Sequence, residues 1–154
     1  MVWVLPAVHA ANGAAEMALR RKAREFALQM LFQWEIGKQK SAQIESNFWK
    51  GARAERNTRV FANQLFEGAV GESEELDELI KLHAEHWRIE RIAAIDRAIL
   101  RLAAHELRSG KTPPKVVINE AIELAKKFSS EDAAPFINGI LDAIHKGLLS
   151  EKID

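Results

Sequence analysis

The chain has 154 residues, 47% hydrophobic and 29% charged, a composition typical of a folded globular protein rather than a disordered one. Its 22 basic and 22 acidic residues cancel, so nucleic-acid binding would have to come from a local basic patch. The absence of cysteine excludes disulfides, thiolate catalysis and cysteine-ligated metals, and no apolar run reaches the roughly 18 residues of a membrane span. We therefore expect a single cytoplasmic domain that does not enter a membrane.

Residues 1–16 differ in composition from the rest of the chain. They are rich in alanine, contain Pro6 and Gly13, and show no helical periodicity. No Lys or Arg precedes the short apolar stretch, which argues against a secretory signal. We predict that residues 1–16 are a disordered or non-native extension and that Met17 is the natural start.

The first predicted helix, residues 18–34, carries two chemically different faces. Its core stripe consists of Leu19, Ala23, Phe26, Ala27, Met30 and Trp34. The opposite side holds Arg21, Arg24, Leu28 and Phe32, flanked by Arg20 and Lys22. Two interpretations stay open: a second packing face, or an RNA-binding face on which guanidinium groups contact phosphates and a ring stacks on a base.

The remaining apolar patterns predict further helices separated by short loops. In chain order they span Ser41 to about Gly51, residues 55–70, a helix starting at Ser73, residues 88–107, residues 116–128 and residues 135–144. No stretch alternates apolar and polar residues in the manner of a strand. The sequence therefore predicts an all-α domain of about seven helices over residues 17–149, with a short tail at 150–154.

Charged side chains on two later helices are the next candidates for binding. Arg97, Arg101 and Arg108 share one side of the helix over 88–107, a strip open either to a ligand or to intrahelical pairing. Asp96 falls closer to the apolar side than a free surface carboxylate should. In the helix over 116–128, Glu123 and Lys127 stand at the spacing of an i,i+4 ion pair.

The sequence favours neither catalysis nor metal binding. His83 and His86 form an HxxH pattern with no third ligand at a recognisable spacing. No serine lies in a nucleophile elbow, and there is no Walker loop and no GxGxxG motif. We expect no catalytic residue, no metal and no cofactor.

Four motifs, in this order and spacing, resemble the NusB family. They are RRKAREFALQMLFQW, ERIAAIDRAILRLAAHEL, the stretch from Pro114 to Phe128 and FINGILD. The resemblance runs from about Ala18 to Ile144 and implies an all-helical fold of two small subdomains. It also implies a transcription antitermination factor that binds the single-stranded boxA element of ribosomal RNA leaders with NusE, a small-subunit ribosomal protein, within the RNA polymerase antitermination complex.

The resemblance also implies where the binding residues lie. The RNA-binding positions correspond to Arg20, Arg21, Lys22, Arg24, Phe32, Phe136, Asn138 and Gly139. The NusE-facing acidic position corresponds to Asp96, with Arg97 and Arg101 as its neighbours. Relatives usually have tyrosine at the position of Phe32, so a hydrogen bond to RNA is lost there while stacking is kept.

Two alternatives belong to other functional classes. NusB-like domains also precede the catalytic domain of ribosomal RNA cytosine methyltransferases, and this chain has neither the cofactor-binding loop nor the cysteine of that enzyme. A helical protein-interaction module without RNA binding is the second alternative, and RNA titration distinguishes it. The sequence does not decide between a monomer and a homodimer.

Overall fold

The computed structural model describes residues 4–84 and 88–153, with side chains for residues 13–84 and 88–151. The described part contains α-helices, one short 3₁₀-helix and no strand, which confirms the all-α prediction. In chain order the elements are α1 (Val4–Ile36), α2 (Ser41–Gly51), α3 (Arg56–Gly71), α4 (Ser73–His83), η1 (Ile89–Arg91), α5 (Ala94–Ser109), α6 (Pro114–Phe128) and α7 (Ala133–Ile153).

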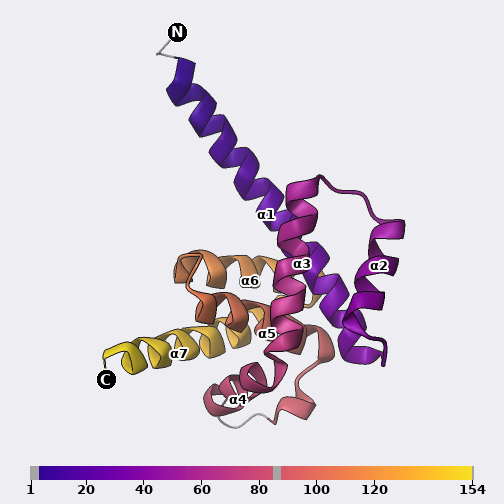
Figure 1. Ribbon diagram of the computed structural model, residues 1–154. Coiled ribbons are helices and arrows are strands. Elements are labelled where there is room, and N and C mark those ends of the chain that lie inside the picture. The colour runs from indigo at the N-terminus through magenta and orange to yellow at the C-terminus, as the bar shows by residue number, and fades with distance from the viewer. Residues whose placement is uncertain (1–3, 85–87, 154) are drawn as a thin grey trace.

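The helices form two groups that share one buried interface (Figure 1). In the first group α1 packs on α3 and α2, where the rings of Phe26 and Trp49 meet edge to face at 5.2 Å. In the second group α5, α6 and α7 pack on one another, with α4 against α5 and α7. Contacts of α5 with α1 and α3 join the groups, so one continuous core runs through the molecule.

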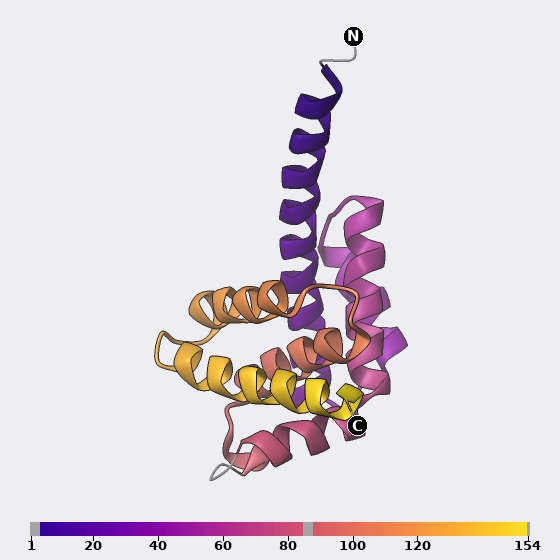
Figure 2. The same ribbon diagram turned by 90° about the vertical axis from the view of Figure 1, so that its left-hand side faces the viewer.

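The middle of α1 is buried on all sides. Every residue from Ala23 to Leu28 is buried, since α3 covers one side of the helix and α5 and α6 approach the other (Figure 2). Of the two interpretations left open for the face that carries Leu28, the second packing surface holds for this residue, because Leu28 is fully buried.

Several helix boundaries differ from the sequence pattern, three of them by more than two residues. Helix α1 begins at Val4, so the backbone of residues 4–16 is helical, and Figure 2 shows this part projecting beyond the bundle. Helix α5 begins only at Ala94, after η1. Helix α7 continues to Ile153 and thus includes most of the predicted tail.

The chain reverses sharply between α5 and α6. Gly110, directly after α5, adopts φ 69°, a left-handed conformation that glycine reaches without strain. Pro114 then occupies the first turn of α6, where a missing N–H costs nothing. This turn brings α6 back along the molecule to α1.

Candidate nucleic-acid interface

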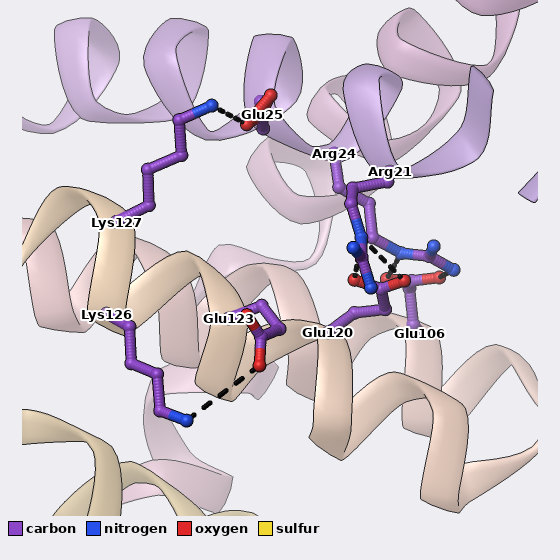
Figure 3. A network of polar contacts seen from close by, with 8 residues as sticks. All are labelled: Arg21, Arg24, Glu25, Glu106, Glu120, Glu123, Lys126 and Lys127. Atoms are coloured by element: carbon purple, nitrogen blue, oxygen red, sulfur yellow. Dashed lines mark hydrogen bonds and ion pairs between the residues drawn. The ribbon is translucent and has the colours of Figure 1, made fainter. Parts of the chain in front are cut away.

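Arg21 is an exposed cation held in place by a carboxylate of another helix. Its Nε donates to both oxygens of Glu120 on α6, at 3.0 and 3.3 Å, while 59% of the arginine side chain stays exposed (Figure 3). The hydrogen bond and the charge of Glu120 raise the pKa of Arg21 above its ordinary value. The guanidinium is therefore charged, oriented and accessible to an anion.

Arg24 lies inside the protein, contrary to the expectation from the helical wheel. Its Nε and Nη2 donate to the two carboxylate oxygens of Glu106 on α5, at 2.9 and 2.8 Å, and only 3% of Arg24 is exposed. Both partners are covered where α1 meets α5 (Figure 3). This bidentate pair already engages the guanidinium that the sequence assigned to RNA.

Lys22 and Lys127 both contact the carboxylate of Glu25. The Nζ of Lys22 lies 3.7 Å from Glu25, and Lys127 of α6 reaches across to the same carboxylate. The expected pair of Glu123 with Lys127 is wrong, because Glu123 faces Lys126 instead at 3.9 Å (Figure 3). Lys127 is thus a cation at the α1–α6 boundary that the sequence pattern did not reveal.

Two hollows lie along α1 just before its buried middle, one facing α6 and one facing α3. We call the first the α1–α6 hollow, about 590 Å³, lined by Ala14, Met17, Ala18, Arg21, Lys22, Glu25, Glu120 and Lys127. The second, the α1–α3 hollow, is about 470 Å³ and is lined by Ala15, Glu16, Leu19, Arg20, Asn57, Thr58, Val60, Phe61 and Gln64. In the second hollow the guanidinium of Arg20 lies 5.5 Å from the centre of the Phe61 ring and 3.0 Å from the carboxylate of Glu16.

A third hollow brings together two residues that the resemblance assigns to different ligands. This Asp96–Phe136 pocket, about 340 Å³, is lined by Arg91, Ile92, Ala93, Asp96, Ser130, Asp132, Ala133 and Phe136. The Oδ1 atom of Asp96 is enclosed and accepts no hydrogen bond from the described residues. Sequence reasoning missed Arg91, Ser130 and Asp132, which lie in connections whose position depends on how α5 and α7 pack.

Arg97 and Arg101 do not form an open cationic strip. Arg101 is buried and donates to Asp77 of α4 at 2.6 and 2.9 Å, and it also contacts Glu35 of α1. Arg97 lies 2.9 Å from Glu35 and donates to the carbonyl of Ile89 at 3.1 Å. These arginines of α5 join it to α1 and α4, since both contact Glu35 of α1 and Arg101 also contacts Asp77 of α4.

The remaining candidate RNA-binding residues lie apart from Arg21 and Lys22. Phe32 is half-buried, about 16 Å along α1 from Arg21 at 1.5 Å per residue. Asn138 and Gly139 are exposed on α7, and a Cβ at Gly139 would meet no atom within 4 Å. The structure thus gathers Arg21 and Lys22 in one hollow and Phe136 with Asp96 in another.

The described residues offer no metal site and no membrane span. No group of three or more histidine and acidic side chains comes together among them. The Nδ1 atom of His83 lies 3.0 Å from the carbonyl of Leu79, and His86 lies outside the described residues. No helix in this part of the chain is long and apolar enough to cross a membrane.

Comparison with known proteins identifies the family. The NusB family model matches residues 21–146. This chain belongs to the NusB family. It is 51% identical over 135 residues to the transcription antitermination protein NusB of Koribacter versatilis, covering 86% of this chain and 92% of that protein. It is 45% identical over 132 residues to NusB of Solibacter usitatus, covering 84% and 90%.

Solved structures agree with the family assignment. The NusB structure of T. maritima superimposes with a TM-score of 0.75 at 34% identity, covering 82% of this chain and 90% of that one. A structure of the antitermination factors NusB and NusE with double-stranded RNA gives 0.76 at 30% identity, covering 85% and 98%. The NusB family comprises transcription antitermination factors rather than enzymes, and the methyltransferase alternative gains no support from relatives matched over 90% or more of their own length.

Proposed function

We propose that this NusB-family protein binds the boxA element of nascent ribosomal RNA leaders together with NusE. In that role it keeps RNA polymerase from terminating early, and it acts in the cytoplasm as part of the antitermination complex. The observation that carries the proposal is the exposed cationic cluster on α1 in a fold whose relative is solved with NusE and RNA.

The RNA-binding surface in this proposal is smaller than the one drawn from the resemblance. Arg20, Arg21 and Lys22 are exposed and supply phosphate contacts, while Arg24 supports α1 from below through Glu106. Phe32, Phe136, Asn138 and Gly139 stay assigned to RNA, with the two rings as stacking platforms. Arg97 and Arg101 become supports for α5, whereas Asp96, which lines the Asp96–Phe136 pocket, stays assigned to the protein partner.

The charge of the chain predicts that RNA affinity depends on the partner. The formal net charge of the chain is zero, so its one short basic patch binds single-stranded RNA only weakly. At physiological salt, exposed charges farther apart than about 8 Å are largely screened from one another. NusE adds phosphate contacts, so we expect it to raise RNA affinity by about 5- to 150-fold, the range typical of allosteric coupling.

The test is a titration of labelled boxA RNA into the chain alone and into the chain with saturating NusE. A scrambled RNA of equal length controls for sequence preference. Asp96→Lys should abolish the gain from NusE and leave the weak affinity of the chain alone nearly unchanged. Equal dissociation constants with and without NusE would refute the cooperative function and leave a simple RNA-binding helical protein, and no RNA binding in either titration would favour the interaction module.

A further inference from the structure

The α1–α6 hollow presents positive charge to solvent although its charged residues nearly balance. The side chains of Arg21, Lys22 and Lys127 are 59%, 54% and 60% exposed. Those of Glu25 and Glu120 are only 9% and 11% exposed, because the cations and the two helices cover them. An anion that approaches this hollow therefore meets three cations before it meets a carboxylate.

The covered carboxylates hold these cations at the rim of the hollow. Glu120 accepts two hydrogen bonds from Arg21, and Glu25 contacts Lys127 (Figure 3). Glu25 also lies 3.7 Å from the Nζ atom of Lys22. Side chains that are already ordered lose less conformational entropy when they bind a ligand. The arrangement is thus suited to a chain of phosphates that crosses from α1 to α6.

Lys127 also lies between the exposed cations of α1, Arg21 and Lys22, and the Asp96–Phe136 pocket. Ser130, which lines that pocket, lies three positions after Lys127 in the chain, so their Cα atoms lie within about 11 Å of each other. Lys127 lies in the last turn of α6, and its Nζ atom is 5.5 Å from the centre of the Phe128 ring. One extended strand can therefore contact both regions by passing Lys127.

The hollow on the other side of α1 offers no such path. Arg20 is the one cation among its lining residues, and Glu16, whose side chain is 63% exposed, lies 3.0 Å from it. Within this lining the charges of Arg20 and Glu16 thus offset each other. Of the two hollows, only the α1–α6 hollow has a net positive lining.

We propose that Lys127 is a phosphate-contacting residue and that the α1–α6 hollow carries the RNA backbone from Arg21 and Lys22 of α1 past the end of α6 toward Phe136. This inference rests on the proposed function, because it places the path of the RNA that the function requires. It adds a third helix segment, the end of α6, to a surface otherwise assigned to α1 and α7.

Two neighbouring lysines provide a matched pair of variants. Lys127→Gln removes the cation at the hollow, whereas Lys126→Gln removes the same charge from a side chain that faces Glu123, away from α1 (Figure 3). The affinity for boxA RNA is measured for both in the presence of NusE over a range of salt concentrations. The log of the binding constant falls as the log of the salt concentration rises. Loss of one phosphate contact makes this negative slope shallower by about 0.7 and weakens binding about fivefold at 0.1 M salt.

We expect this change for Lys127→Gln and a wild-type slope for Lys126→Gln. Urea unfolding of each variant separates loss of binding from loss of folding. If Lys127→Gln binds boxA RNA with wild-type affinity and an unchanged salt slope, the inference is wrong and the proposed function still stands. If the wild-type protein itself does not bind RNA, both the inference and the proposed function are wrong. Equal slope changes in the two variants would also overturn it, because they would reflect net charge alone.

Photo-crosslinking tests the path independently of charge. Met17 lines the α1–α6 hollow and is 65% exposed, whereas Val60 lines the α1–α3 hollow and is 46% exposed, so each side chain has room for a photoreactive phenylalanine. We expect RNA adducts from position 17 and none from position 60. Adducts from position 60 alone would place the strand on the α3 side and refute the inference.

Discussion

The buried ion pair of Arg24 with Glu106 provides the sharpest test of whether this basic residue of α1 stabilises the fold or binds RNA. Replacing Arg24 by methionine leaves the Glu106 carboxylate without its partner in an environment where only 4% of that residue is exposed. Breaking a buried ion pair from one side costs about 3–5 kcal/mol, a large fraction of the 5–15 kcal/mol by which a domain is typically stable. A protein of this size loses about 2–4 °C of melting temperature per kcal/mol, so the decrease should reach about 6 °C or more.

The assay is urea unfolding followed by far-ultraviolet circular dichroism. Arg20→Met is the matched control, because Arg20 lies in the same helix and pairs with Glu16 at the surface, where such a pair contributes about 0–1 kcal/mol. The double variant Arg24→Met, Glu106→Leu should lose less stability than the sum of the single variants, since it leaves no unpaired charge. In RNA titrations, Arg24→Met should keep the wild-type salt slope for the folded fraction.

The opposite pattern would refute the reasoning. If Arg24→Met costs less than about 1 kcal/mol and flattens the salt dependence of RNA binding, the guanidinium contacts phosphate in solution rather than Glu106. If Arg20→Met destabilises the protein as much as Arg24→Met does, burial is not what distinguishes the two arginines.

Two further predictions concern Glu45 and Gly139. Burial, together with the hydrogen bond and charge of Glu67, raises the pKa of Glu45 from 4.5 to about 7. The folded protein then retains a proton that the unfolded chain releases, so the free energy of unfolding should fall as pH rises between these two values. Glu45→Gln should remove this decrease, and equal losses of urea midpoint from pH 5 to pH 8 in the variant and the wild type would contradict it. Gly139→Ala should raise the free energy of unfolding by up to about 1 kcal/mol, because alanine favours a helix and its Cβ meets no neighbour within 4 Å. A simultaneous loss of boxA affinity would show that RNA approaches this glycine closely, and a lower urea midpoint would refute the prediction.

The sequence by itself determined where most helices lie, because apolar periodicity and helix-ending residues act locally. The starts of α2 at Ser41 and of α4 at Ser73 are examples. Residues 4–16 escaped this signal, since the backbone of this projecting part of α1 is helical although its sequence shows no apolar periodicity (Figure 2). The motifs also determined the family, because four of them in register identify a fold without any knowledge of contacts.

Only the tertiary structure decided which cations are free to bind a ligand. Arg21, Arg24 and Lys127 look alike in a helical wheel, yet their partners lie 99, 82 and 102 residues away in the chain. An ion pair between distant segments leaves no periodic trace, because it depends on how two helices approach and not on the spacing within either one. Arg24 is buried and Lys127 reaches α1 for the same reason: packing of α5 and α6 against α1 decides which charges are covered and which remain at the rim.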